Sequence, residues 1–81
     1  MKMATKHDLK DWVSEALATE GGASDVVSVA KRIWQTHEQD LRQSGDLFFT
    51  WQYDMRWAAF TLRKEGRLKA VDDKALPWEI A

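Results

Sequence analysis

The side chains best suited to chemistry in this sequence are the arginine, lysine and glutamine residues between Gln52 and Lys69. If residues 50–65 form a helix, four of its residues fall within one outward stripe about 60° wide, namely Gln52, Arg56, Ala59 and Arg63. Arginine pairs with guanine and glutamine with adenine in the DNA major groove, so Gln52 and Arg56 are candidates for reading base edges. Basic side chains also bind phosphates, and the candidates for that role are Arg63, Lys64, Arg67 and Lys69.

The same residues also have a plain structural interpretation, as the solvated side of a helix. Arg63 and Lys64 come near the expected helix end, where cations interact favourably with the helix dipole whatever the function. Arg56 lies in mid-helix, where this explanation is weaker, although Asp54 is close enough in the sequence to pair with it. Pairing of Arg56 or Arg63 within the molecule would weaken the case for nucleic-acid binding.

Net charge is a second test of that case. The 81 residues carry 12 Lys and Arg against 13 Asp and Glu, a net charge of −1, whereas dedicated DNA-binding domains are usually basic. The charge is unevenly distributed, however, because residues 50–71 hold five cations and two carboxylates, a net +3. A local positive patch can bind an anion although the whole chain is slightly acidic.

Sequence motifs for catalysis or metal binding are absent. The chain has no cysteine, which excludes disulfides and thiolate sites and fits a reducing cytoplasm. His7 and His37 fall on different expected helices, and no HExxH or glycine-rich phosphate loop occurs. His37 lies on an apolar stripe where a packed side chain is expected, and a solvated turn explains Asp72 and Asp73 better than a cation site does. We therefore expect no enzyme activity, no cofactor and no metal.

The length and hydropathy pattern predict one small cytoplasmic domain. A chain of 81 residues is enough for one core, and a domain near this size buries only about 60% of its unfolded surface. Residues 1–4 have no apolar h-region, and no apolar run approaches the roughly 20 residues needed to cross a bilayer. Neither a signal peptide nor a membrane partner is expected.

Two helices are predicted in the first half of the chain. The first runs from about Lys6 to Glu20, capped by Thr5 with Asp8 completing a capping-box-like pattern, and its apolar stripe consists of Leu9, Trp12, Val13, Ala16 and Leu17. The second runs from about Asp25 to Gln43 with Ser24 as N-cap. Glycines end both helices, at residues 21–22 and 45. Residues 46–49 are expected to form a connection in which Phe48 and Phe49 fill the seam between the second and third helices, and the alternative is a surface patch for a partner.

The predicted third helix runs from about Thr50 to Glu65. Met55, Ala58 and Leu62 form its core side, while Tyr53 and Phe60 border the outward stripe. The sequence has five tryptophans, a residue on which nucleic-acid bases can stack. Core packing is expected for Trp12, Trp34, Trp57 and Trp78. For Trp51 two interpretations stay open: packing under the turn before the helix, or a place beside a binding face.

Two strand-like segments follow, Leu68–Val71 and Leu76–Ile80, joined by a polar turn. Their apolar residues alternate with polar ones, as in a two-stranded ribbon with one buried face. Pro77 cannot donate to a ladder, so its strand is expected at an edge. Two strands alone are barely stable in water, so the ribbon must pack on the helices, with Trp78 as the anchor.

The segment Arg56-Trp57-Ala58 and the run Leu62-Arg63-Lys64-Glu65-Gly66-Arg67-Leu68 resemble the winged-helix domain at the N-terminus of Mrr-type restriction endonucleases and related proteins. The closing run Leu76-Pro77-Trp78-Glu79-Ile80 extends the resemblance over the last third of the chain. It implies a DNA-binding role with the third helix in the major groove, where Gln52 and Arg56 would face bases and Arg63, Lys64 and Lys69 the backbone. The turn Asp72-Asp73-Lys74 departs from it, since carboxylates repel phosphates, and Arg67 replaces an apolar residue.

The sequence thus predicts a single α+β winged-helix domain over residues 1–81, with three helices and a C-terminal hairpin. The favoured function is binding of double-stranded DNA by the third helix, as a regulator or accessory factor. The alternative is a protein-interaction module that kept the fold and lost DNA binding. Winged helices often act as dimers because one helix contacts few base pairs, and the first candidates for a dimer surface are Phe48, Phe49 and Trp51.

Overall fold

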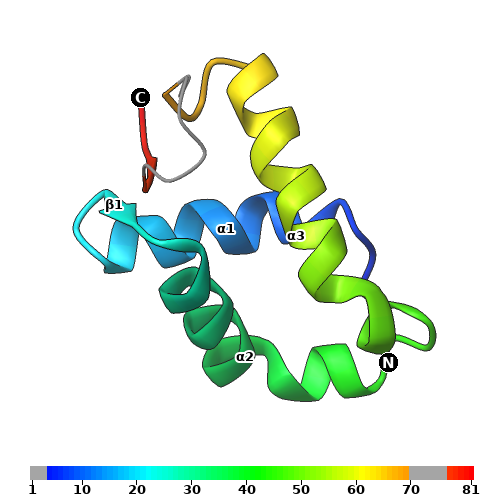
Figure 1. Ribbon diagram of the computed structural model, residues 1–81. Helices are drawn as coiled ribbons and strands as arrows, with labels where there is room; N and C mark the ends of the chain where they lie inside the picture. The colour runs from blue at the N-terminus through cyan, green and yellow to red at the C-terminus, as the bar shows by residue number, and fades with distance from the viewer. Residues whose placement is uncertain (1–3, 70–76) are drawn as a thin grey trace.

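Three helices and a short antiparallel sheet make up the part of the chain that this computed structural model describes, residues 4–69 and 77–81 (Figure 1). In chain order the elements are α1 (Asp8–Thr19), β1 (Ala23–Ser24), α2 (Val26–Arg42), α3 (Leu47–Lys64) and β2 (Trp78–Glu79). The predicted α+β class and the three helices are therefore confirmed.

Helix α1 begins two residues later than the sequence predicted. Its N-cap residue is His7, without a side-chain capping bond, so the predicted cap at Thr5 is wrong. The Asp8 carboxylate accepts a hydrogen bond from the Thr5 backbone N–H at 2.9 Å. This bond is the backward half of the expected capping box. Leu9, Val13, Ala16 and Leu17 are buried, as their spacing predicted. The helix ends where Gly21 and Gly22 adopt positive φ, and the Gly22 N–H reaches back to the Leu17 carbonyl at 2.7 Å.

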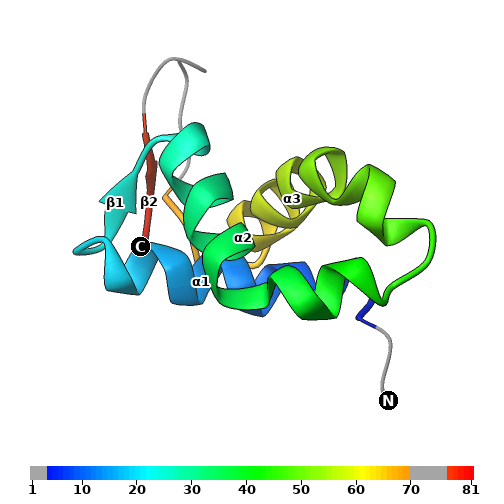
Figure 2. The same cartoon turned by 90° about the horizontal axis from the view of Figure 1, so that it is seen from below.

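Helix α2 is capped by Asp25, which corrects the prediction of Ser24. The Asp25 carboxylate accepts from the Ser28 backbone N–H at 3.2 Å, and the helix begins at Val26. Ser24 instead belongs to β1, where it pairs with Trp78, so its backbone is already used in a strand. The helix is also bent at His37, whose φ of −124° and ψ of 21° are not helical. Figure 2 shows the two parts of α2 running in different directions.

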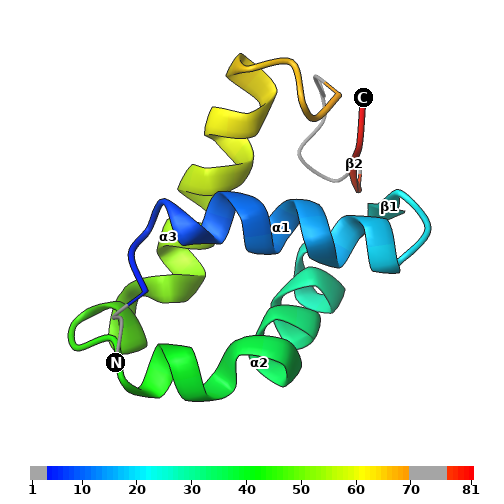
Figure 3. The same ribbon diagram turned by 180° about the vertical axis from the view of Figure 1, so that it is seen from behind.

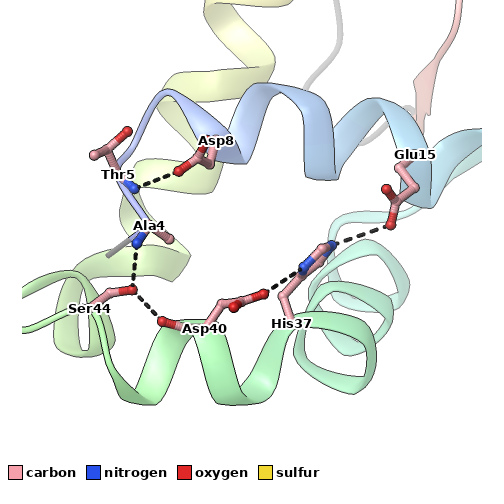
Figure 4. Close-up of polar contacts among 7 residues, drawn as sticks. All are labelled: Ala4, Thr5, Asp8, Glu15, His37, Asp40 and Ser44. Carbon is pink, nitrogen blue, oxygen red and sulfur yellow. Dashed lines mark hydrogen bonds and ion pairs between the residues drawn. The ribbon is translucent and has the colours of Figure 1, made fainter. Parts of the chain in front are cut away.

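Helix α3 begins at Leu47, so Phe48 and Phe49 lie in its first turn and not in a connection as predicted. The turn before it is short because Gly45 adopts a φ of +59°. Ser44 is buried there, and its hydroxyl accepts from the Ala4 N–H at 3.1 Å and donates to the Asp40 carbonyl (Figure 4). These bonds fasten residue 4 to the end of α2.

The sheet pairs segments that are far apart in the sequence. β1 and β2 are antiparallel, with Ala23 opposite Glu79 and Ser24 opposite Trp78. Leu68 forms a further antiparallel bridge with Ile80, next to a hydrogen bond from the Lys69 N–H to the Glu79 carbonyl at 2.8 Å. The β1 partner was missed, because two residues between Gly22 and Asp25 carry too short a pattern to indicate a strand. Residues 70–76, with the predicted turn at Asp72–Lys74, lie outside the described residues.

Helix α1 covers one side of the pair formed by α2 and α3. It crosses behind α3 in Figure 1 and in front of it in Figure 3. Seven large side chains among those fully buried form the centre of the core: Leu9, Val13, Leu17, Val29, Ile33, Leu41 and Leu62. Trp78 closes the core at the sheet and is buried, as predicted.

Candidate functional site

The exposed face of α3 carries the two predicted base-reading residues. Gln52 and Arg56 are both exposed, one helical turn apart. Within residues 4–69 and 77–81, neither side chain has a hydrogen bond or an ion pair with another residue. Asp54, the expected competitor for Arg56, instead accepts a hydrogen bond from the Thr50 hydroxyl at 2.7 Å. Both groups are therefore available to a ligand.

Ala59 does not share this face, which corrects its predicted place in the outward stripe. It is fully buried, as is its neighbour Ala58. Two adjacent buried residues point about 100° apart on a helix, so the buried sector of α3 is wider than a single stripe. The reason is that α3 packs against α1 and against α2, and the sequence pattern of one helix does not show how many neighbours it has.

The cations at the other end of α3 are placed differently from one another. Arg63 is half-buried, with its guanidinium carbon 6.0 Å from the centre of the Trp78 ring. Its Nε is buried and has no hydrogen-bond partner in the described part of the chain. Lys64 is exposed, with its Nζ 5.1 Å from the Phe60 ring. Of these two predicted phosphate ligands, Lys64 reaches solvent and Arg63 lies against the sheet.

The last two predicted phosphate ligands have partners at the surface. Arg67 donates from Nη2 to the Ser14 hydroxyl at 3.3 Å, and Lys69 forms an ion pair with Glu79 at 2.8 Å. Exposed ion pairs contribute only about 0–1 kcal/mol, so a phosphate could replace Glu79 as the partner of Lys69 at small cost. Gln52 and Arg56 thus lie one turn apart on the exposed face of α3, Lys64 is exposed at the far end of the helix, and Arg63, Arg67 and Lys69 lie nearer the sheet.

Three aromatic side chains stand on the same outward side of α3. Phe49, Tyr53 and Phe60 are 84%, 77% and 56% exposed, and their spacing of four and seven residues keeps them on one face. The sequence placed Tyr53 and Phe60 at the border of the basic stripe, but Phe49 was expected to fill a seam. That expectation was wrong, because the helix begins earlier and turns Phe49 outward. Phe48 makes the expected inward contact instead, edge-on to Trp34 at 6.3 Å.

An open groove of about 600 Å³ runs between α2 and α3 beside this face. Its lining residues are Val26, Val27, Ala30, Lys31, Trp34, Phe48, Trp51, Gln52, Met55 and Arg56. Trp51 stacks on Trp34, with ring centres 6.1 Å apart, and is only 6% exposed. Trp51 is thus packed against α2 and also lines the groove, so its burial does not separate the two interpretations left open for it. The groove itself was missed, since it depends on the spacing between two helices.

The polar cluster around His37 holds α1 and α2 together. The His37 ring stacks on Trp12 with centres 4.0 Å apart and planes at 8°. Its Nδ1 lies 3.3 Å from Asp40 and its Nε2 lies 3.3 Å from Glu15 (Figure 4). The packed state expected of His37 is confirmed. This cluster lies on the α1 side of α2, so it braces the helix that forms one wall of the groove.

The described residues form neither a metal centre nor a membrane-spanning helix. No group of three or more His, Cys, Asp or Glu side chains in residues 4–69 and 77–81 is placed to hold a metal ion. No helix in this part of the chain combines the length and the apolar character required to span a membrane. In comparisons with known proteins, no family model, curated protein or solved structure matches the chain.

Proposed function

We propose that this chain is a winged-helix protein, similar to the N-terminal domain of Mrr-type endonucleases, that binds double-stranded DNA through α3. The observation that carries the proposal is the pair of exposed side chains Gln52 and Arg56, neither engaged with another described residue. Their amide and guanidinium groups are the ones that form paired hydrogen bonds with adenine and guanine. In this role the protein would act as a regulator or accessory factor.

The arrangement of the elements supports the same proposal. A winged helix needs three helices and a sheet beside the end of the third helix. Here β2 pairs with β1, and Leu68, shortly after α3, bridges to Ile80. Arg67 and Lys69 flank Leu68 in the sequence, and in this proposal they would contact the DNA backbone from the sheet side of the domain. Phosphate contacts set the position of a protein on a duplex, while base contacts set its sequence preference.

A salt titration tests the proposal directly. A fluorescent duplex of random sequence is titrated with the protein at about 50 mM and about 200 mM salt, and anisotropy is recorded with parallel amide spectra. We expect micromolar binding that weakens steeply with salt, with shifted amides between Gln52 and Lys69. Absence of binding at the lower salt concentration would contradict the proposal, since phosphate attraction underlies nearly all DNA binding.

Two variants of α3 separate base reading from phosphate contact. Arg56→Ala should reduce affinity to an extent that depends on the DNA sequence. Lys64→Ala should reduce it evenly and lower the slope of log affinity against log salt by about 1. The matched control is Arg42→Ala, which removes an exposed cation of α2 that pairs with Glu38. Equal small losses from all three variants would exclude α3 as the reading helix.

A second candidate function is a protein-interaction module on the same fold. It is favoured by the exposed aromatic side chains Phe49, Tyr53 and Phe60, which surround Arg56 with apolar surface. Exposed aromatic residues with arginine are typical of the centre of protein interfaces. The net charge of −1 also fits this candidate better than the first.

A further inference from the structure

The groove between α2 and α3 combines an apolar interior with cations on both walls. Lys31 extends the α2 wall and Arg56 the α3 wall, and both side chains are exposed. Apart from these two and Gln52, every lining residue is apolar, and no described carboxylate lines the groove. The groove therefore complements a ligand that is apolar at its centre and negatively charged at its edges.

Both cations lack a carboxylate partner in the described part of the chain. Other cations of α2 have carboxylate partners, since Arg32 pairs with Glu20 at 2.9 Å and Arg42 pairs with Glu38 at 2.8 Å. Lys31 has no such pair among residues 4–69 and 77–81, nor does Arg56. A ligand carboxylate would thus meet these two cations without first breaking an existing ion pair.

The shape of the groove sets the size of its occupant. Its interior reaches Trp51 and Met55, which are 6% and 2% exposed, whereas Val27 at the rim is 61% exposed. Each wall spans nine residues, Val26–Trp34 on α2 and Phe48–Arg56 on α3, and the eight steps between the first and the last residue correspond to about 12 Å of helix. That length matches about two turns of a helix lying in the groove.

We propose that this groove binds an amphipathic helix of an acidic protein partner. Leucine or aromatic side chains spaced three or four residues apart would enter between Trp34, Trp51 and Met55, as in other helix-in-groove complexes. Glutamate or aspartate side chains on the flanks of that helix would pair with Lys31 and Arg56. This inference goes beyond DNA binding, although the two ligands would share Arg56 and so compete for it.

Two other occupants fit the groove less well. A DNA duplex presents phosphates, which would gain from the two cations but nothing from the apolar interior. A small apolar anion would need a site that covers most of its surface, and this groove is open along its rim. A protein helix uses the apolar interior, the cations and the open side at once.

Selection from a peptide library tests the proposal. The displayed peptides are about 18 residues long, roughly five helical turns, with varied apolar residues on one face and Glu or Lys allowed at each flanking position. We expect selection on the immobilised protein to enrich Glu at the flanks and Leu, Phe or Trp on the apolar face. No enrichment, or enrichment of Lys, would overturn the proposal. Selection of apolar residues without any preference for Glu would overturn it as well.

Variants of the groove locate the site of the selected peptide. Ala30→Phe fills the groove and should weaken binding at least about tenfold, because anchor side chains dominate such interfaces. Lys31→Glu should weaken it about threefold or more by placing like charges together. The control is Lys64→Glu, an equal charge change on α3 outside the groove lining, which should have a smaller effect. Urea unfolding of each variant shows that the fold is kept, and Lys31→Glu remains decisive if Ala30→Phe unfolds.

A competition experiment between the selected peptide and a DNA duplex distinguishes failure of the groove proposal from failure of the DNA-binding proposal. Selected peptide bound in the groove should displace a duplex that depends on Arg56. If the peptide binds and DNA does not, the groove proposal stands and the DNA proposal fails. The DNA proposal stands and the groove proposal fails if DNA binds but selection yields no peptide. The same conclusion follows if DNA binds and the selected peptides bind equally well to the Ala30→Phe and Lys31→Glu variants.

Discussion

The two ends of α3 carry the same kinds of side chain in opposite circumstances. Near the sheet, Arg63 lies over Trp78, Arg67 donates to Ser14 and Lys69 pairs with Glu79. Near the groove, Gln52 and Arg56 are exposed and have no side-chain partner among the described residues. Basic character alone therefore does not mark a binding surface. The cations near the sheet already contact Trp78, Ser14 or Glu79, whereas Gln52 and Arg56 can meet a ligand without giving up such a contact.

The largest expected effect comes from comparing one aromatic residue at the sheet end of the molecule with one at the groove end. Trp78→Ala removes a buried side chain from the junction of sheet and core, and should lower the free energy of unfolding by about 3 kcal/mol or more. Phe49→Ala removes an exposed side chain and should change it by less than about 0.5 kcal/mol. Urea unfolding followed by circular dichroism measures both. A large loss from Phe49→Ala would mean that the groove end is also structural.

Two arginines give a smaller test of the same kind. The guanidinium of the half-buried Arg63 lies over the Trp78 ring, so Arg63→Ala should destabilise the protein by about 1 kcal/mol. Arg56→Ala should leave the unfolding free energy nearly unchanged. The measurement is again urea unfolding, with Arg56→Ala as the matched control. If the two variants were equally stable, Arg63 would belong with the available cations.

The start of α2, at the groove end, depends on its capping residue Asp25. Hydrogen bonds from Ser28, first from its hydroxyl and then from its backbone N–H, lower the pKa of the Asp25 carboxyl below its ordinary value. Because the pKa is lowered, the charged carboxylate stabilises the fold at pH values above the unfolded-state pKa of about 3.9. This stabilisation is lost as the pH falls through the lower pKa of the folded state. Asp25→Ala should therefore reduce the melting temperature by a few degrees near neutral pH.

The pH dependence of that difference is the sharper measurement. Melting curves of the natural protein and of Asp25→Ala should differ by a constant amount well above pH 4 and converge below about pH 4. A difference that persists unchanged in acid would show that the cap acts through something other than its charge.

The smallest expected effect concerns the ion pair between Lys69 and Glu79. Glu79→Gln releases Lys69 and removes a carboxylate from the sheet end, so it should raise affinity for a DNA duplex by up to about threefold. Glu38→Gln on α2 is the control, since it releases Arg42 with the same change in net charge. Equal gains from both variants would indicate that net charge alone sets the affinity.

The sequence predicted the elements well and their mutual arrangement poorly. Three helices and the buried role of Trp78 followed from apolar spacing and glycine positions, because those signals are local. The β1 strand, the buried place of Ala59 and the outward turn of Phe49 did not follow, because each depends on a neighbour distant in the sequence. For the site, the residue types were identifiable at Gln52 and Arg56. The groove was not, since its walls come from two helices whose separation no local pattern encodes.

The bend of α2 at His37 divides that helix into two short segments, residues 26–36 and 38–42. Isolated helices shorter than about 12–15 residues are marginal in water, so each segment persists only through its own contacts with the rest of the molecule. The first segment forms a wall of the groove, and the second ends at the turn that Ser44 fastens to Ala4. Their amide hydrogens should therefore exchange with solvent as two independent cooperative units. Occupation of the groove would then slow exchange in the first unit and leave the second unchanged.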